Sequence, residues 1–364
     1  MSINNFEVSG SAFLLSNGML HRTDAKTSHG LIRSSNRFTI KAVIDTFSAG
    51  RDAGEVLDGV NRNIPVFAEL DEAILKVGKP DYCIIGVATV GGVLPLEMTT
   101  VIKEALSKGI SVVNGLHYHL NDQPEMVELA KKTGAKMIDV RKPKTFKELK
   151  FWSEEVFEVK CPVIAVMGMD CAIGKRTTAL FLKQACEKAG LKAEMIYTGQ
   201  TGGMQGNKYG FILDSTLNDF VSGELSHAII SAWKNEHPDL IFIEGQSSMR
   251  NPSGPCGAEF LISGNAKKVI LVHEPARKYF DLDPKWGEIP SVESEIKLIG
   301  CYGSEVIALM LNSTGMSVEE AKAARDSYSQ KLGIPVILPL EDGVESLVQT
   351  LKNLTSENKK YQGI

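Results

Sequence analysis

The stretch Val163-Ile-Ala-Val-Met-Gly168, Met169-Asp-Cys-Ala-Ile-Gly174, Lys175-Arg-Thr-Thr-Ala179 decides the fold of this chain. Its first part is short, apolar and β-branched, which predicts a buried parallel strand. Good helix formers follow Lys175 up to Gly190, a residue type common just past a helix end. Between strand and helix, a glycine-bounded loop ending in lysine offers a phosphate backbone N–H groups, a helix N-terminus and a positive charge. The alternative is an ordinary strand-to-helix turn with a chance Gly-Lys pair.

This loop departs from the usual nucleotide-binding pattern at two places. Five residues separate Gly168 from Gly174, where the usual loop has four. Arg176 stands where a serine or threonine hydroxyl normally binds Mg²⁺, and Thr177 is turned about 100° from that direction. We therefore predict a loop that binds phosphate without Mg²⁺-triphosphate, with Arg176 taking over part of the metal's electrostatic role. The predicted phosphate-binding residues are Gly168, Asp170, Cys171, Ala172, Gly174, Lys175, Arg176 and Thr177.

The composition is that of a soluble globular protein with two domains. The chain has 364 residues, of which 43% are hydrophobic and 23% charged, and its formal net charge of −4 without a basic block argues against a nucleic-acid partner. No apolar run approaches the roughly 20 residues of a membrane helix, and the N-terminal residues lack a signal pattern. The six cysteines form no Cys-x-x-Cys pair, which predicts reduced thiols in a cytoplasmic protein. A homo-oligomer is expected, because parallel α/β enzymes of this size often form one.

Strand and helix patterns alternate along the first half of the chain. Such alternation predicts βαβ units, a parallel sheet and a Rossmann-like domain over residues 1–155. No Gly-x-Gly-x-x-Gly follows the first expected strand, at 38–45, so no dinucleotide site is predicted. Residues 1–37 are interpreted as irregular, and the segment 24–33 as a solvated loop. Further strands are expected at 64–67, 82–88, 110–114 and 136–140, and helices at 52–59, 71–77, 95–108 and 123–133.

His117 and His119 follow one of these strands. Two histidines at this spacing could share a metal, but metal sites usually need three or more ligands and the sequence shows no third. We therefore predict a polar loop or a substrate contact at His117, and no metal site.

The second half, over residues 156–364, predicts a P-loop NTPase-like parallel sheet domain. The strand expected at 192–197 ends in Thr198-Gly-Gln-Thr-Gly-Gly-Met204, which is interpreted as a flexible loop over the ligand. The strand expected at 239–244 ends in Glu244, an acid that orients Mg²⁺ or its water in metal-dependent relatives. The alternative for Glu244 is a strand-end acid that caps a loop.

A third buried strand in this half, expected at 268–273, ends in His273. Arg277 follows four residues later. Because parallel strands present their carboxyl ends at one edge of a sheet, both side chains are candidates for the same site as the phosphate loop.

Two resemblances connect these motifs to known proteins. The phosphate loop and the pair Glu244-Gly245 resemble those of dethiobiotin synthetase and of the cobyrinic acid amidating enzymes. Nearly the whole chain resembles a two-domain family long catalogued as a domain of unknown function, with a Rossmann-like N-terminal half and a P-loop C-terminal half. The residues that carry this resemblance are Ala25-Lys-Thr27, Gly30-Leu-Ile-Arg33, Gly86-Val-Ala88, Gly91-Gly92, Gly115-Leu-His117, Asp139-Val-Arg-Lys-Pro143, Gly168–Lys175, Glu244-Gly-Gln246 and His273-Glu-Pro-Ala-Arg277.

Characterised members of that family are similar to D-glutamate N-acetyltransferase. The resemblance therefore implies acetyl transfer from acetyl-CoA to the amino group of an acidic amino acid. Such a reaction needs a base, donors for the thioester oxyanion and cations for two carboxylates. The catalytic candidates are Glu244 and His273. The substrate-binding candidates are Lys26, Arg33, His117, Gly199, Gln200, Thr201, Gln246 and Arg277.

Two other functions stay open at this point. One is an ATP-dependent ligase or kinase resembling dethiobiotin synthetase, with Mg²⁺ at Glu244 and Asp170, although Arg176 counts against it. The other is a non-catalytic sensor that binds a nucleotide or CoA without turnover. Acetyl-CoA is thus the expected co-substrate, Mg²⁺ is expected only for the ligase, and the expected partner is a small molecule.

Overall fold

The computed structural model describes residues 8–89, 92 and 94–361, and the chain divides into two compact units. The first unit extends to Lys144 and also contains Gln200–Asn207, whereas Thr145–Gly199 and the chain from Lys208 onward form the second. No helix in these ranges is long and apolar enough to cross a membrane. The predicted Gly91 of the Gly91-Gly92 motif and the first seven residues lie outside the described residues.

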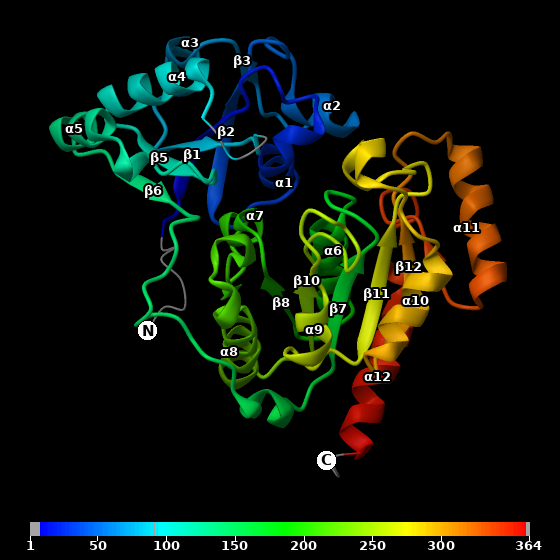
Figure 1. Cartoon of the computed structure of the whole chain (residues 1–364). Helices are drawn as coiled ribbons and strands as arrows, with labels where there is room; N and C mark the ends of the chain where they lie inside the picture. Colours follow the sequence, from blue (N-terminus) through cyan, green and yellow to red (C-terminus); the bar gives the residue numbers. More distant parts are fainter. Residues whose placement is uncertain (1–7, 90–91, 93, 362–364) are drawn as a thin grey trace. The chain divides into compact units, whose positions relative to one another are not determined.

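The described part of the first unit forms a six-stranded parallel sheet in the order β3-β2-β1-β4-β5-β6 (Figure 1). The chain starts at the centre of this sheet and builds outward in both directions, as in a Rossmann-like domain. Its strands are β1 (Gly10–Leu15), β2 (Phe38–Ile44), β3 (Val66–Phe67), β4 (Tyr82–Ile85), β5 (Ser111–Asn114) and β6 (Met137–Asp139). Its helices are α1 (Lys26–Arg33), α2 (Ala53–Asp58), α3 (Leu70–Val77), α4 (Leu96–Ser107), α5 (Pro124–Thr133) and α7 (Gln200–Met204).

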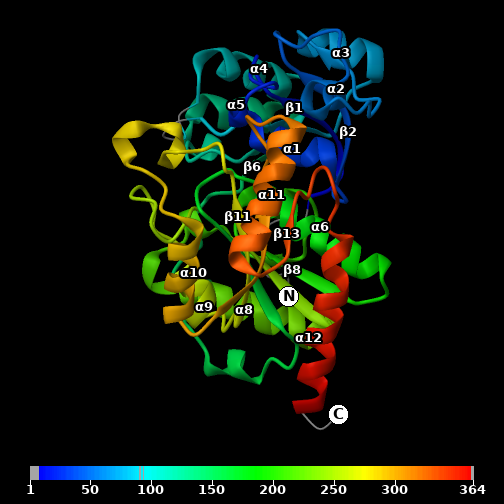
Figure 2. The ribbon, with the colours of Figure 1, turned by 90° about the vertical axis from the view of Figure 1, so that its right-hand side faces the viewer.

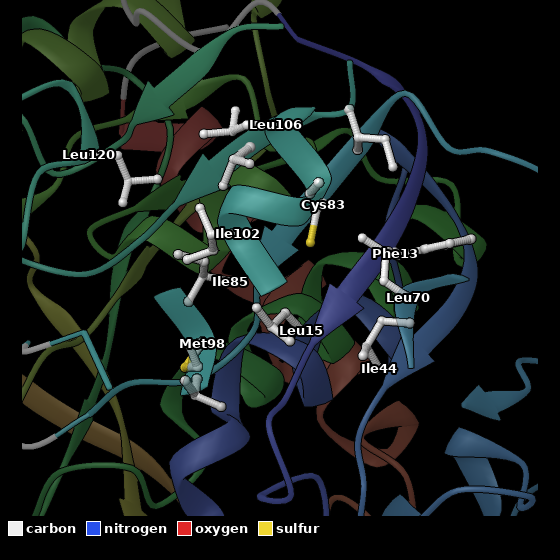
Figure 3. Packing of buried hydrophobic residues seen from close by; sticks show 14 of the residues in the cluster. Phe13, Leu15, Ile44, Leu70, Cys83, Ile85, Met98, Ile102, Leu106 and Leu120 are labelled. Atoms are coloured by element: carbon white, nitrogen blue, oxygen red, sulfur yellow. The ribbon is translucent and has the colours of Figure 1, made fainter. Parts of the chain in front are cut away.

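Strand β1 divides the apolar core of this unit between the two faces of the sheet. Successive side chains of a strand point to opposite faces, and accordingly Phe13 and Leu15 belong to one buried cluster and Leu14 to another. Figure 3 shows Phe13 and Leu15 in the same cluster as Met98 and Ile102 of α4.

The structure shows that the interpretation of residues 1–37 as irregular was wrong. Residues 12–15 of β1 are at most 1% exposed, and α1, expected as a solvated loop, buries Thr27, Ser28 and Leu31. A short helix with so few large apolar residues gives a weak sequence signal, because its stability comes from packing. The strand expected to be first is therefore β2.

The described part of the second unit forms a seven-stranded parallel sheet in the order β13-β12-β11-β7-β10-β8-β9 (Figure 1). Every residue of β7 is buried, as its continuous apolar sequence predicts. Its strands are β7 (Val163–Gly168), β8 (Ala193–Tyr197), β9 (Tyr209–Gly210), β10 (Leu240–Glu244), β11 (Lys268–His273), β12 (Glu305–Leu311) and β13 (Val336–Ile337). Its helices are α6 (Lys175–Lys188), α8 (Asn218–Glu236), α9 (Ala258–Ile262), α10 (Val292–Cys301), α11 (Val318–Leu332) and α12 (Val348–Tyr361). Helix α10 packs on β12 (Figure 1) and α11 packs on β13 (Figure 2).

The segment expected as a flexible loop after β8 is instead the buried helix α7. Its residues pack with α1 inside the first unit. The Thr201 and Thr27 hydroxyls lie 3.0 Å apart, and the Gln205 amide donates to the Gly30 carbonyl at 2.9 Å. The chain therefore leaves the second unit after Gly199, contributes this helix to the first, and returns at Lys208.

Candidate functional site

The phosphate loop joins β7 directly to α6. The aliphatic part of Lys175 packs against two glycines, since a Cβ on Gly168 would lie 2.8 Å from its Cδ and a Cβ on Gly245 would lie 3.1 Å from it. Gly174 has φ 107°, in the left-handed region that favours glycine, and precedes the first residue of the helix. These glycines let the lysine lie close to the backbone of the loop, as a phosphate cradle requires.

The positive charge of the phosphate loop lies at the first turn of α6. Lys175 is 6% exposed, and its ammonium group donates to the backbone oxygen of Asp170. Arg176 and Thr177 lie half-buried in the first turn. A helix N-terminus that carries two cations favours an anionic ligand.

Asp170 holds the loop in shape through three donors. Its Oδ1 accepts a hydrogen bond from the Asn251 side chain at 2.8 Å, and its Oδ2 accepts from Arg277 at 2.9 Å and from the backbone N–H of Asp281 at 2.8 Å. The carboxylate is fully buried. Asn251 and Asp281 thus belong to the site, although no motif in the sequence points to either.

Arg277 links this aspartate to the strand end of β11. Its guanidinium donates to Asp170, to the backbone oxygen of Cys171 at 2.9 Å and to Glu274 at 3.1 Å. Burial raises the pKa of the Glu274 carboxyl, and the neighbouring Arg277 opposes this rise. We call Asp170, Asn251, Glu274 and Arg277 the loop clasp. Arg277, a candidate for substrate binding, therefore pairs with two carboxylates of the protein itself.

One group of side chains has the geometry of a cation site. Potential ligand atoms of Asp170, Cys171 and Asp281 lie within 4.8 Å of one another. Both oxygens of Asp170 already accept N–H donors, one of them from a cation, and burial raises the pKa of the Cys171 thiol. These features disfavour a bound cation. His117 and His119 join no such group in the part of the chain that the structure describes.

Glu244 ends β10, the strand next to β7 in the sheet. It is 3% exposed, and its Oε2 accepts hydrogen bonds from the backbone N–H groups of Thr198 at 3.0 Å and Gly199 at 3.4 Å. Burial raises the pKa of this carboxyl, whereas Arg176 and the two N–H groups lower it. No described residue donates to Oε1, so one oxygen is anchored and the other is left for another partner.

Two side chains support this arrangement. The Thr198 hydroxyl donates to the backbone oxygen of Glu244 at 2.6 Å and accepts from the Gln246 amide at 3.1 Å. Thr198 therefore donates to both the side chain and the backbone carbonyl of Glu244, and Gln246 in turn donates to the Thr198 hydroxyl. Nothing in the sequence distinguished Thr198 beyond its place at the end of a strand.

His273 ends β11, on the other side of β7 from Glu244. Its Nε2 lies 3.2 Å from the Tyr328 hydroxyl, and its buried Nδ1 has no partner among the described residues. Burial lowers the pKa of this imidazole to about 4, so the ring is neutral at neutral pH.

The remaining candidates lie in the first unit. Lys26 is exposed at the start of α1, Arg33 pairs with Asp58 at 3.3 Å, and His117 is exposed after β5. In α7 the Gln200 side chain accepts a hydrogen bond from Arg141 at 3.1 Å, and Thr201 contacts Thr27. The structure thus groups Glu244, Gly199, Gln246, His273 and Arg277 with the phosphate loop in one unit, and groups Lys26, Arg33, His117, Gln200 and Thr201 in the other.

Comparisons with known families match both units. A family model described as "Domain of unknown function (DUF1611_C) P-loop domain" matches residues 150–348, and one described as "Domain of unknown function (DUF1611_N) Rossmann-like domain" matches residues 46–143. These matches confirm the predicted α/β fold class and the predicted resemblance to a two-domain family.

Individual relatives cover most of the chain. A crystal structure of a DUF1611 family protein from Anabaena variabilis is 28% identical, with a TM-score of 0.86 over 95% of this chain and 100% of that one. A "D-glutamate N-acetyltransferase" from Pseudoalteromonas sp is 28% identical over 282 residues, which are 76% of this chain and 82% of the relative. A protein of the same name from Tritonibacter scottomollicae is 29% identical over 290 residues, or 78% and 84%.

Proposed function

The chain belongs to the DUF1611 family, and from that premise we propose that it is an N-acetyltransferase that moves the acetyl group of acetyl-CoA to the amino group of an acidic amino acid. D-glutamate is the first acceptor to test. The observation that carries the proposal is the similarity, over most of both chains, to two proteins named D-glutamate N-acetyltransferase. The geometry of the phosphate loop and of Glu244 supports it.

The phosphate loop supports CoA as the donor. CoA carries a diphosphate and a further phosphate, and Lys175, Arg176 and the N-terminus of α6 bring donors and positive charge to one place. Arg176 replaces the hydroxyl that would bind Mg²⁺, and the clasp uses the carboxylate of Asp170. This loop therefore suits a phosphate that binds without a metal ion.

Glu244 supports the proton-transfer step. The amine nitrogen bonds to the carbonyl carbon, the carbon–sulfur bond breaks, and the proton lost by nitrogen passes to Glu244 and then to the leaving thiolate. A base must be anchored yet have a lone pair to offer. Glu244 meets both needs, because Oε2 holds the N–H groups of Thr198 and Gly199 while no described residue donates to Oε1.

The test is the release of free thiol from acetyl-CoA, without metal or ATP, across a panel of D- and L-amino acids. We expect release with D-glutamate or a close acidic relative, and none with the amine omitted. Mg²⁺-dependent ATP hydrolysis with no thiol release for any amine would overturn the proposal in favour of a ligase or kinase. Tight CoA binding with neither reaction would overturn it in favour of a sensor.

Replacing Lys175 by methionine is expected to weaken CoA binding about 10- to 100-fold, the loss for a hydrogen bond to a charged group. Methionine keeps an apolar stem against Gly168 and Gly245, so the loop stays packed. Titration calorimetry with CoA measures the effect. Lys188→Met, at the exposed far end of α6, is the matched control and should leave affinity unchanged. Equal affinities for both variants would contradict the phosphate cradle.

A further inference from the structure

The side-chain amide of Gln246 lies near Oε1 of Glu244, the carboxylate oxygen to which no described residue donates. A Cβ on Gly199 would lie 2.8 Å from Nε2 of Gln246 and 3.6 Å from Oε1 of Glu244. Apart from the chain neighbours of Gly199, no other side chain among the described residues lies closer to that position. Because glycine has no side chain, the amide and the carboxylate border the same position.

The hydrogen bonds of Thr198 decide which end of the Gln246 amide faces it. The Thr198 hydroxyl has one hydrogen, which it donates to the backbone oxygen of Glu244 at 2.6 Å. It therefore accepts from Gln246 at 3.1 Å, so the atom of Gln246 at that place is the amide nitrogen. This nitrogen carries two hydrogens. One is bound to Thr198, and no residue in the described ranges accepts the other.

The Gln246 amide is anchored to buried groups but belongs to a residue that solvent reaches. Its partner Thr198 is 1% exposed, and Glu244, to which Thr198 is bonded, is 3% exposed. Gln246 and Gly199 are half-buried. A donor that is fixed before the substrate arrives stabilises a developing negative charge without a cost of reorganisation.

The other substrate-binding candidates of the second unit have their donors engaged. The backbone N–H of Gly199 donates to Oε2 of Glu244 at 3.4 Å. The guanidinium of Arg277 donates to two carboxylates and to a backbone oxygen of the phosphate loop. Gln246 is the remaining candidate, and its second N–H is the donor that this group of residues has to offer.

We propose that the Gln246 amide donates a hydrogen bond to the carbonyl oxygen of the acetyl thioester during the reaction. This assignment rests on the proposed acetyl transfer. When the amine nitrogen bonds to the carbonyl carbon, an electron pair of the carbonyl bond moves to its oxygen. The pair returns as the carbon–sulfur bond breaks and the thiolate leaves. The proton of the amine passes to Glu244, while Gln246 keeps its hydrogen throughout and stabilises the negative oxygen.

Replacing Gln246 by methionine is expected to lower kcat for acetyl transfer about 10²- to 10³-fold, the effect of removing one oxyanion donor. Methionine has a similar volume and no N–H, and the KM for acetyl-CoA should change little. Gln349→Met, at an exposed position of α12, is the matched control and should keep the native kcat. A native chain that releases no thiol with any amine would overturn the acetyltransferase itself. An active native chain and a Gln246→Met variant of equal kcat would overturn only the role of Gln246.

A dithioester analogue of acetyl-CoA separates a hydrogen bond to the substrate from a purely structural contact with Thr198. In the analogue, sulfur replaces the carbonyl oxygen and accepts hydrogen bonds only weakly. The ratio of the native kcat to that of Gln246→Met should therefore fall below about 10, the worth of a weak neutral hydrogen bond. A ratio equal to that for acetyl-CoA would show that the amide acts only through Thr198, and would overturn the proposal.

Gly199→Ala tests the geometry while the amide stays in the chain. The φ angle of Gly199 lies outside the left-handed region, so alanine suits the backbone, but its Cβ would meet Nε2 of Gln246 at 2.8 Å. We expect kcat to fall about 10²-fold, the cost of displacing a catalytic group by about 1 Å. Gly300→Ala, where a Cβ would meet no described atom within 4 Å, is the matched control. A Gly199→Ala variant that is folded by circular dichroism and retains the native kcat would overturn the proposal.

Discussion

Replacing Glu244 by glutamine is expected to lower the turnover number for acetyl transfer about 10²- to 10⁴-fold, the range that a general base contributes. Glutamine has the same size and retains an oxygen that can accept from the N–H groups of Thr198 and Gly199. It cannot accept the proton that leaves the amine. The loss should therefore lie in kcat, with the KM for acetyl-CoA little changed.

The matched control is His273→Gln, which removes the other candidate base. Burial lowers the pKa of His273 to about 4, its Nδ1 is buried, and its Nε2 faces the Tyr328 hydroxyl. We expect this variant to lose much less turnover than Glu244→Gln. If the losses were reversed, His273 would be the base and Glu244 would hold the loop around Thr198.

The Glu244→Gln substitution is also expected to change how stability and activity depend on pH. Burial raises the pKa of the Glu244 carboxyl, so the stability this group contributes is complete below the ordinary carboxyl pKa and is lost as pH rises through the raised value. At neutral pH, Glu244→Gln removes a buried charge and should not lower the melting temperature. The native activity should fall as pH drops through that raised pKa, because the base becomes protonated, and the residual activity of the variant should lack this step.

The strand, loop and helix around Lys175 were predictable because each part has a local signal. An all-apolar strand, two spaced glycines and a run of helix formers agree with one another, and the structure has β7, the loop and α6 at those places. The loop clasp was predictable only in part. The strand-end position of Arg277 placed it at the same edge of the sheet as the phosphate loop, and it does contact Asp170. Asn251 and the backbone of Asp281 reach Asp170 from 81 and 111 residues further along the chain, and no local pattern in the sequence indicates contacts so remote.

Helix α7 is a second feature that the local sequence did not predict. Its sequence, Gln200-Thr-Gly-Gly-Met204, contains two glycines and predicts a flexible loop. Tertiary contacts override that preference, since Arg141 donates to Gln200 and Thr27 contacts Thr201 within the first unit. Burial rather than helix propensity stabilises the segment.

Replacing Arg277 by methionine is expected to destabilise the second unit by about 3–5 kcal/mol, the usual cost of breaking a buried ion pair by removing one partner. Asp170 and Glu274 are 0% and 5% exposed, and both would lose their cation. Methionine fills a similar volume, so the loss would be electrostatic. Chemical denaturation of the full chain, monitored by a probe in the second unit, measures the effect.

Two further variants test whether the loss of stability comes from the buried ion pairs of Arg277. Lys278→Met removes the adjacent exposed pair with Glu288 and should change the free energy of unfolding little. Asp170→Asn/Arg277→Met removes an acid together with its cation and should recover part of the stability. A double variant no more stable than Arg277→Met would contradict the assignment of the loss to an unpaired Asp170.

The pH dependence of the Arg277→Met effect follows from Glu274. Burial raises the pKa of that carboxyl and Arg277 opposes the rise, so without the arginine the pKa in the folded state should rise further. The stability that Arg277 supplies through Glu274 is complete above the raised pKa that the carboxyl has without the arginine, and it is lost as pH falls through that value, because protonation removes the charge it pairs with. The free energy of unfolding of the native chain and that of Arg277→Met should therefore differ less near about pH 5 than near about pH 8. Arg277 also donates to the backbone oxygen of Cys171 in the phosphate loop. The affinity of Arg277→Met for CoA should therefore fall together with its stability. Such a result would indicate that a buried ion pair, and not a metal ion, maintains the shape of the phosphate loop.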